Sequence, residues 1–480
     1  MKSLIKRNLN EIQLKKISVL FLYFFVCTQC SVVEENVNQS EFDQLIKTAN
    51  QMVNFNGSVL IGNSEKVLYY EQIGFADKQK NTPLTEKHLF STGSIGKEFS
   101  TLAVMKLVEN GKLNYKDKVS KYVTSLPNWS SQITIENIMT HTSGLPSINW
   151  FVGIESEDVN AQINAVKELA FLPGNGFLYT NMNIVIRSYV IEALTGMNYQ
   201  DFVTQEILRK ANMSTAIQPI GMNKLTSQIT YHEDPNALKA ISLYATPFDL
   251  YNFEKSLWRD QIIKSSSLKK VLSGDEYSGS RNRAYFDFGR FHLNNDGEIS
   301  YWEHDGSSWP SHHAIKYHNF EKDIFIILMS NDGNKNTLFE LKAAILKLLE
   351  TRLVTIPLIW KFKQEYFAQG GEKAIVNLQK QAQQNLDIEV SEGELNTIGY
   401  WLFQQEKYLE VKSVFKLNLE LFPNSANAHD SYAEVLIKIN DYKQAEIILI
   451  NGLKLAKKED NNNLINSLTG QLKKIEQLVK

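Results

Sequence analysis

The residues whose types and spacing best suit catalysis are a serine and a lysine three positions apart. Ser94-Ile95-Gly96-Lys97 opens a helical pattern that runs from 94 to 110 and stops at Gly111. On a helix this spacing puts the hydroxyl and the amine on one face, one turn apart. The helix N-terminus and burial both disfavour a protonated amine, so Lys97 is placed to take the proton of Ser94. The same spacing recurs at four other places in the chain, so alone it also fits a helix cap and a solvated lysine.

A second group of polar residues follows Pro173-Gly174. Tyr179-Thr180-Asn181 stands there, directly before an amphipathic helical pattern over 182–194 that Gly196 ends. A tyrosine hydroxyl near a serine and a lysine can relay protons to a leaving group. The Asn181 amide both donates and accepts, so it can hold a substrate amide or carbonyl. The alternative is a packed tyrosine followed by an Asn helix cap.

The third group, His304-Asp305-Gly306, ends a strand pattern and is the only His-x-Gly in the chain. A glycine at a strand edge lets a substrate backbone approach closely. The amide of Ser307, together with that of Ser94, would then form an oxyanion hole. The alternative is a turn at Asp305-Gly306 with an incidental histidine.

The histidines near this third group raise the question of a metal. They are His304, His312, His313 and His318. No matching carboxylate and no His-x-x-x-His helix signature accompanies them. We therefore predict no metal and no cofactor.

Strand patterns stand at both ends of the first 350 residues, with helical patterns between them. The predicted strands are 57–62, 66–70, 286–292, 301–303, 314–317 and 324–330; the predicted helices include 94–110, 134–140, 182–194 and 336–353. Because the hairpins are local, the sheet should be mostly antiparallel. This predicts an α/β (α+β) fold with helices flanking the sheet and a helical subdomain.

The remainder of the chain has a helical pattern that repeats with a period of 34 residues. Residues at matched positions are Gly399 and Ala433, Leu402 and Leu436, Tyr408 and Tyr442, Val411 and Ala445, Phe415 and Leu449. These small and large packing positions are typical of tetratricopeptide-type helix pairs. Residues 357–390 could hold one more degenerate pair. Leu464, Leu468, Leu472 and Ile475 share one face of a last helix that would cap the stack.

The N-terminus is typical of an export signal. A basic stretch precedes the apolar run from Ile17 to Val26, which has signal-peptide length and is too short to span a bilayer. Cys30 could carry a lipid, although Cys27-Thr28-Gln29 is a poor lipoprotein box. Lipid anchoring, free secretion and an uncleaved anchor all stay open. Cys27 and Cys30 are the only cysteines, so the rest of the chain has neither a disulfide nor a thiol nucleophile.

The patterns divide the chain into four parts: a signal at 1–30, a linker at 31–40, a catalytic domain at 41–353 and a helical repeat domain at 354–480. The formal net charge is -2. That balance gives no case for nucleic acid or for an anionic membrane surface as partner.

The three polar groups, in this order, resemble the serine β-lactamases, D,D-peptidases and related esterases. The likeness is closest to the class C type, which has tyrosine in the second group. Further matches, interpreted as scaffold, are Thr134-Ile135 through His141-Thr142-Ser143-Gly144-Leu145, and Ala245-Thr246 with Asp249-Leu250. The resemblance covers about residues 45–350.

By this resemblance Ser94 is the acylated nucleophile, Lys97 the first base and Tyr179 the proton relay. Asn181 would bind substrate. No glutamate of the kind that serves deacylation is recognisable, so Tyr179 would serve both half-reactions.

His304 would stand where β-lactamases carry the lysine of Lys-Thr-Gly. A neutral histidine offers a hydrogen bond in place of a fixed charge, and Asp305 adds negative charge. Both changes favour ester, D-amino-acid amide or peptide-like substrates over penicillins. Gly306 and Ser307 would complete the substrate-binding edge.

We therefore predict an exported serine hydrolase, periplasmic or a membrane-anchored lipoprotein, acting on a small peptide-like or ester substrate. The alternative is a catalytically weak penicillin-binding-protein-like peptide receptor. In either case the helical repeats could bind a protein partner.

Overall fold

A computed structural model describes residues 38–149, 156–216, 243–272, 285–294, 296–308, 312–331, 335–384 and 390–478. The predicted export signal, with Cys27 and Cys30, lies outside the described residues, as does most of the predicted linker. In the described part, no helix has both the length and the apolar character needed to cross a bilayer. Contacts divide the chain into two units: Met1–Lys47 with Phe55–Leu353, and Thr48–Asn54 with Val354–Lys480.

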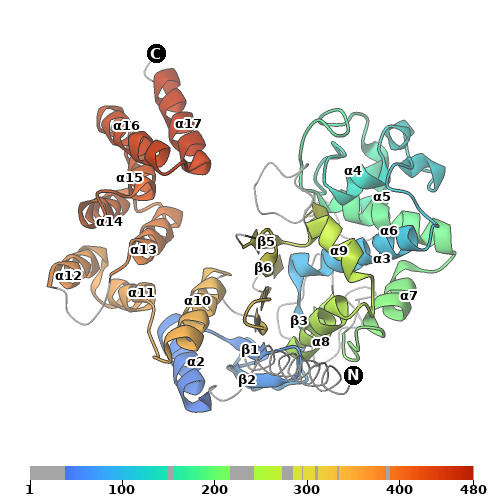
Figure 1. Cartoon of the computed structure of the whole chain (residues 1–480), viewed down its shortest axis with the longest axis horizontal. Helices are drawn as coiled ribbons and strands as arrows, with labels where there is room; N and C mark the ends of the chain where they lie inside the picture. The colour runs from blue at the N-terminus through green and yellow to red at the C-terminus, as the bar shows by residue number, and fades with distance from the viewer. Residues whose placement is uncertain are drawn as a thin grey trace, which may run out of the picture. The chain divides into compact units, whose positions relative to one another are not determined.

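The first unit is built on a six-stranded antiparallel sheet of order β2-β1-β8-β7-β6-β5 (Figure 1). Its strands are β1 (Gly57–Gly62), β2 (Val67–Ile73), β5 (Arg290–Leu293), β6 (Ile299–Ser308), β7 (His312–Asn319) and β8 (Ile324–Ser330). A separate pair joins β3 (Phe90–Ser91) to β4 (Tyr244–Ala245). β1 and β8 are buried along their whole length and lie in the interior of the sheet, between β2 and β7.

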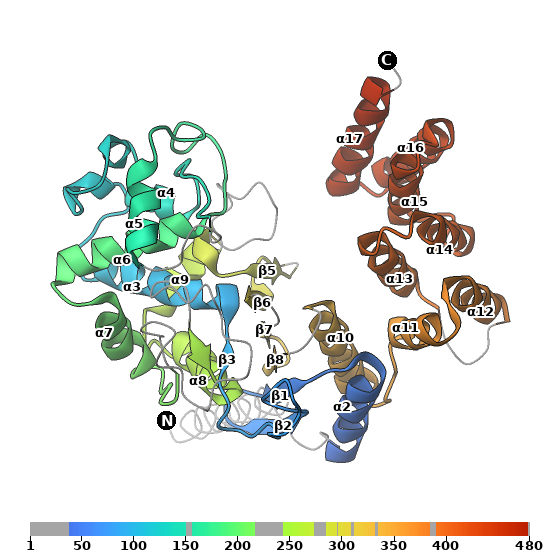
Figure 2. The same cartoon turned by 180° about the vertical axis from the view of Figure 1, so that it is seen from behind.

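Helices lie on both faces of this sheet. They are α2 (Gln39–Val53), α3 (Lys97–Glu109), α4 (Ile135–Met139), α5 (Ser156–Ala165), α6 (Asn181–Thr195), α7 (Tyr199–Val203), α8 (Pro247–Trp258), α9 (Ser265–Leu272) and α10 (Lys335–Thr351). α10 packs on one face, with α2 next to it, while α3 and α8 lie on the other face with α4, α5, α6, α7 and α9 (Figures 1 and 2). This confirms the predicted antiparallel sheet with flanking helices and a helical subdomain.

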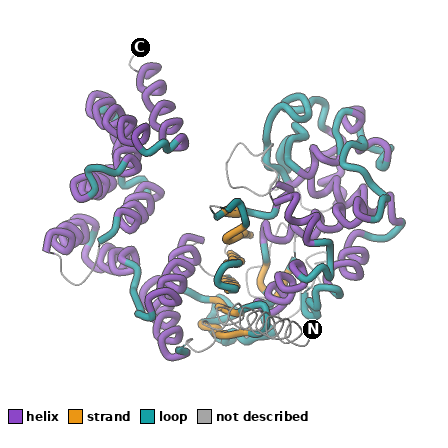
Figure 3. Tube along the Cα trace, viewed as in Figure 1, coloured by secondary structure: helices purple, strands orange, loops and turns teal. Residues whose placement is uncertain are grey.

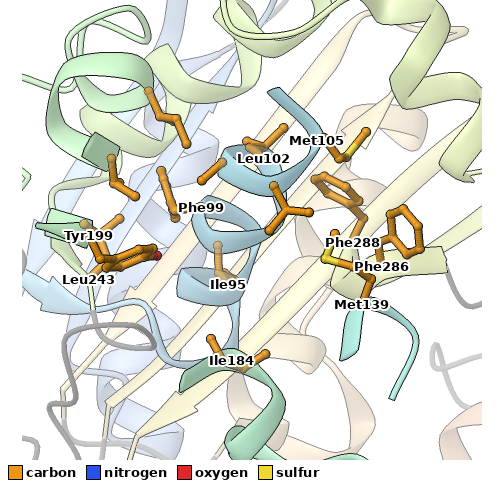
Figure 4. Packing of buried hydrophobic residues seen from close by; sticks show 14 of the residues in the cluster. Ile95, Phe99, Leu102, Met105, Met139, Ile184, Tyr199, Leu243, Phe286 and Phe288 are labelled. Atoms are coloured by element: carbon orange, nitrogen blue, oxygen red, sulfur yellow. The ribbon is translucent and has the colours of Figure 1, made fainter. Parts of the chain in front are cut away.

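The core gathers around α3, which is buried on nearly every side. Ile95, Phe99, Leu102 and Met105 are each at most 2% exposed (Figure 4). Ten of the thirteen residues of α3 are buried, because the sheet lies on one side of the helix and α6 on another. α3 is therefore a fixed support, and its N-terminal end carries the predicted nucleophile.

Helix caps account for the motifs that the sequence marked as scaffold. Thr134 and Asn137 form a reciprocal capping box at the start of α4. Thr246 and Asp249 do the same for α8, with Pro247 at its first position. Such caps satisfy backbone N–H groups that the first helical turn leaves open and contribute about 1 kcal/mol each.

Four predicted strands have different bounds in the structure: 66–70 corresponds to β2 and 314–317 to the longer β7, and the other two differ more. Residues 286–289, predicted as strand, form a short helical turn (Tyr285–Asp287) and a link, and β5 begins only at Arg290. Phe286 and Asp287 there have φ of 64° and 63°, which a strand does not allow. β6 is longer than predicted and contains His304-Asp305-Gly306 within it.

The second unit is an array of helix pairs (Figure 3). Its helices are α11 (Leu358–Gln369), α12 (Gly371–Gln384), α13 (Glu392–Gln404), α14 (Tyr408–Leu421), α15 (Ala426–Lys438), α16 (Tyr442–Lys458) and α17 (Asn462–Leu478). A Cβ on Gly399 would lie 2.1 Å from the Phe415 ring, so the small-against-large pairing is a real contact. Ala433 and Leu449, one period on, are fully buried. Stacked helix pairs are thus shown, while the tetratricopeptide family remains a prediction.

Candidate active site

Ser94 lies on a short helical turn (Gly93–Gly96) that leads directly into α3. Lys97 is the first residue of α3, and its Nζ donates a hydrogen bond of 3.0 Å to Ser94 Oγ. The Lys97 side chain is only 5% exposed. The structure thus brings together the serine and the lysine that the spacing had placed on one face.

Tyr179 approaches the same oxygen from the loop before α6. Its hydroxyl donates to Ser94 Oγ at 3.2 Å, and Lys97 Nζ lies 5.2 Å from the centre of its ring. Tyr179 is 39% exposed, so this side of the serine is open to solvent. Ser94 Oγ therefore has two groups that carry or accept protons within hydrogen-bond reach.

The segment before Ser94 lies against the end of β6. A Cβ on Gly306 would lie 1.9 Å from Thr92 O and 2.8 Å from Ser94 N. A Cβ on Gly93, whose φ is 53°, would lie 2.4 Å from Ser307 N. Such an approach requires glycine on both backbones. It brings the backbones that carry the amides of Ser94 and Ser307 close together, which is the arrangement that an oxyanion hole requires.

The end of β6 beside the serine is an open strand edge. β5 pairs with β6 only as far as Glu303, and no described strand pairs with residues 304–308 on that side. Ser91 ties the approach to the sheet, because its hydroxyl bonds that of Ser308 at 2.7 Å and its N–H donates to His312 Nδ1 at 3.1 Å. These bonds therefore fix the segment that precedes the nucleophile in position against the strand edge.

His304 is buried and engaged with a carboxylate that the sequence analysis did not consider. Its Nδ1 bonds Glu98 Oε1, and Glu98 Oε2 accepts from Lys316 Nζ at 2.7 Å. Lys316 also pairs with Glu254 and lies 3.8 Å from the centre of the Trp302 ring. Glu98, Lys316 and Glu254 are at most 2% exposed, and burial raises the pKa of Glu254. The available signal was that Glu98 directly precedes a stretch without charge, Phe99 to Met105, since a buried acid needs a partner.

Asp305 does not add negative charge to the serine side of the sheet, contrary to the prediction. Its carboxylate pairs with Arg290 at 2.9 Å and with Lys335 at 2.5 Å. Burial would raise its pKa, but Lys335 foremost, then His304 and Arg290, hold the pKa below its usual value. Strand side chains alternate between faces, so His304 and Gly306 face α3 while Asp305 faces α10.

Asn181 opens α6, two residues after Tyr179. Its Oδ1 is buried and has no hydrogen-bond partner among the described residues. Because a buried carbonyl oxygen rarely stays unpaired, this atom suits a donor that arrives with a substrate. Substrate binding by Asn181 stays a prediction.

The histidines weighed as metal ligands are engaged separately. His312 accepts from Ser91, and His313 Nδ1 lies 3.0 Å from Ser307 Oγ. His318 packs between Phe320 and Phe325, where burial lowers its pKa to about 3. Within the described ranges, no group of three or more His, Cys, Asp or Glu side chains is arranged to hold a metal ion.

A buried group behind Tyr179 was also missed. The His141 ring lies 4.5 Å from that of Tyr179, and its Nε2 bonds Asp287 Oδ1 at 2.8 Å. Arg187 Nη2 donates to Asp287 Oδ2 at 2.7 Å. Burial lowers the pKa of His141. Burial would raise the pKa of Asp287, but His141 and Arg187 outweigh it and hold it well below the usual range.

His141, Phe286 and Asp287 in this group all have left-handed backbone, with φ of 57°, 64° and 63°. Non-glycine residues held in this region cost on the order of 1–3 kcal/mol each and persist where the surroundings fix them. The His141 motif was interpreted as scaffold. Arg187, alone in the apolar run of α6, was the other signal that a buried partner existed.

Comparison with known proteins agrees with this geometry. The beta-lactamase family matches residues 42–350. "Penicillin-binding protein 4*" of Bacillus subtilis (strain 168) is 26% identical over 342 residues, covering 64% of this chain and 74% of that protein.

Solved structures share the fold. A class C beta-lactamase superposes with a TM-score of 0.54 at 17% identity, covering 67% of this chain and 99% of its own. The D-amino acid amidase from Ochrobactrum anthropi SV3 has a TM-score of 0.53 at 18% identity, covering 64% and 98%. The chain therefore belongs to the beta-lactamase family, a group of serine hydrolases that includes penicillin-binding proteins.

Proposed function

We propose that this protein hydrolyses its substrate through an acyl-enzyme formed on Ser94. The observation that carries the proposal is the pair of contacts at one oxygen: Lys97 Nζ at 3.0 Å and Tyr179 OH at 3.2 Å from Ser94 Oγ. A serine hydroxyl is a weak nucleophile until an adjacent base takes its proton. Here the candidate base is buried and in contact with that hydroxyl.

In the first half-reaction, the Lys97 amine takes the Ser94 proton as Oγ bonds to the substrate carbonyl carbon. The carbonyl oxygen becomes an oxyanion between the amides of Ser94 and Ser307, which are fixed before the substrate arrives. The bond to the leaving group then breaks, and the leaving group departs with a proton from Tyr179. At the end of this half-reaction Lys97 holds the proton of Ser94 and Tyr179 is a phenolate, and Lys97 Nζ lies 5.2 Å from the centre of the Tyr179 ring.

In the second half-reaction, Tyr179 takes a proton from water as the water oxygen bonds to the acyl carbon. The bond to Ser94 Oγ breaks, and Oγ recovers its proton from Lys97. Tyr179 is the exposed member of the group, so water reaches it directly.

For the substrate, we propose an ester or a D-amino-acid amide in preference to a penicillin. His304 Nδ1 is committed to Glu98, which leaves Nε2 as the ring nitrogen for a substrate. A neutral ring with its proton on Nδ1 accepts at Nε2, which suits a substrate N–H or ammonium better than a carboxylate. The D-amino acid amidase of Ochrobactrum anthropi fits this substrate class by its name, although its likeness to this chain extends to the fold alone.

The test is labelling of the purified protein with a fluorescent fluorophosphonate, beside Ser94→Ala. We expect labelling that disappears in the variant, together with turnover of aryl esters or D-alanine amide well above that of benzylpenicillin. Ser413→Ala is the matched control, because Ser413 also stands three residues before a lysine, Lys416, but in the second unit. It should label as the wild type does.

A peptide receptor without turnover is the second candidate, and the helix pairs of the second unit favour it. A folded protein that neither labels at Ser94 nor hydrolyses any probe would contradict the hydrolase and leave the receptor. We further propose that the protein is exported, either freely or through a lipid on Cys30. Fractionation of cells that express the wild type or Cys30→Ala, with labelled palmitate, tests this.

A further inference from the structure

His141 encloses Tyr179 through three separate contacts. Its backbone oxygen accepts from the N–H of Leu178 at 2.9 Å, and its Nδ1 accepts from the N–H of Thr180 at 3.1 Å. Between these two bonds its ring lies 4.5 Å from the Tyr179 ring, inclined by 34°. One residue therefore fixes the backbone on both sides of Tyr179 and contacts the face of its side chain.

We propose that His141 is a positioning residue that, fixed by Asp287, holds the Tyr179 hydroxyl on Ser94 for proton transfer. The inference rests on the proposed function, in which Tyr179 is the proton relay. It assigns His141 no contact with substrate. Proton transfer needs heavy atoms within about 2.6–3.2 Å, and the Tyr179 hydroxyl is at the outer end of that range. A small rotation of the ring would therefore end the contact.

The hydrogen bonds around His141 select one tautomer. Nδ1 accepts from Thr180 N–H and lies 3.0 Å from Asn183 Nδ2. The Asn183 amide is oriented by Ser143, whose hydroxyl donates to Oδ1 at 2.7 Å, so its NH₂ faces His141. Nδ1 thus carries no proton, and Nε2–H donates to Asp287. With the other tautomer, two donors would oppose each other and the bond to Thr180 would be lost.

Arg187 secures both ends of this arrangement. It donates to Asp287 Oδ2 at 2.7 Å and to Ile138 O at 2.7 and 3.1 Å, and it is fully buried. Ile138 lies near the end of α4, shortly before His141 in the chain. The guanidinium therefore holds the segment that carries His141 and also the carboxylate that accepts from its ring. A histidine that only filled the core would not need this fixed donor and acceptor pattern.

The decisive experiment is a double-mutant cycle of His141→Asn with Tyr179→Phe. Asparagine tolerates the left-handed backbone at this position but removes the ring. The readout is kcat/KM, which reports acylation, for D-alanine p-nitroanilide and for p-nitrophenyl butyrate. An anilide leaving group needs a proton, whereas p-nitrophenolate leaves without one.

We expect His141→Asn to lower kcat/KM for the anilide by about 10- to 100-fold and for the ester by less than about threefold. In the Tyr179→Phe background, the same change should lower the anilide rate by less than about threefold. An equal loss on both substrates and in both backgrounds would show a purely structural role and overturn the proposal. A wild-type anilide rate in His141→Asn would overturn it too.

Ser143→Ala keeps the test decisive if His141→Asn does not fold. It removes the bond that orients Asn183 and leaves the ring in place, so a smaller loss, about 3- to 10-fold on the anilide alone, is expected. Full anilide activity in this variant would count against the tautomer argument. Failure of the proposed function looks different: wild-type protein would not label at Ser94, or Tyr179→Phe alone would retain full activity.

Discussion

Gly306→Ala tests whether the close approach between β6 and the serine segment creates the active geometry. The added Cβ would lie 1.9 Å from Thr92 O, 2.8 Å from Ser94 N and 3.0 Å from Thr92 C. All three are backbone atoms, so no side chain can rotate away. Since real Cβ contacts below 3.0 Å are essentially absent, either β6 or the segment before Ser94 must move by roughly 1 Å.

A displacement of that size acts directly on the amides of Ser94 and Ser307. Loss of one oxyanion donor lowers kcat by about 10²–10³-fold, or about 3–4 kcal/mol. A misplacement of 1 Å costs about 10²-fold. We therefore expect kcat on p-nitrophenyl butyrate to fall by at least about 100-fold. Overpacking should lower the free energy of unfolding by about 1–3 kcal/mol, so most of the protein stays folded.

The assay pairs ester hydrolysis and fluorophosphonate labelling with thermal unfolding. Gly470→Ala is the matched control, because Gly470 is in the middle of α17 and a methyl group added there meets nothing within 4 Å. It should keep full activity and gain up to about 1 kcal/mol of helix stability. If Gly306→Ala kept wild-type kcat and stability, the two backbones could not be as close as described, and the oxyanion hole would be refuted.

Two further predictions concern buried charge and pH. The pKa of His318 is about 3 in the folded protein and 6.5 in the unfolded chain. Between these two values the unfolded chain binds a proton at this residue and the folded protein does not, so the free energy of unfolding decreases as the pH is lowered. Between pH 7 and pH 5 this decrease amounts to about 2 kcal/mol. Urea unfolding of His318→Phe should lack this contribution to the pH dependence. An identical pH dependence in both proteins would contradict the argument. Glu98→Gln leaves His304 and Lys316 without their shared carboxylate, so unfolding should become easier by about 3–5 kcal/mol. The control is Glu420→Gln, which breaks an exposed ion pair with Lys416 and should change the free energy of unfolding by less than about 0.5 kcal/mol. An equally small effect of Glu98→Gln would show that the buried network contributes little to stability.

Much of the site was predictable because its signals are local. Ser94 and Lys97 are one helical turn apart, so helix geometry places their side chains on one face and within reach of each other. Tyr179 and Asn181 are two residues apart at a helix start. The order of the three polar groups indicated the family, and the family in turn indicated the fold. In the helical unit, the repeat period matched Gly399 with Ala433 and Phe415 with Leu449, and the structure then showed that Gly399 packs against the Phe415 ring.

The partners of these residues depend on contacts across long stretches of chain. Glu98 meets His304 over 206 positions, and His141 meets Asp287 over 146, so no local pattern marks either pair. Asp287 was predicted in a strand because its aromatic neighbours favour one, yet tertiary contacts hold it in left-handed backbone.

The sequence by itself determined which residue types stand at the candidate nucleophile, since helical spacing and chain order set them. Tertiary structure alone decided the charge around them. The register of β6 turns His304 and Gly306 to the serine and Asp305 to α10, and a shift of one residue would exchange the two faces. Sheet register is fixed by packing over the whole domain, so the electrostatics of the site could be known only once the sheet was built.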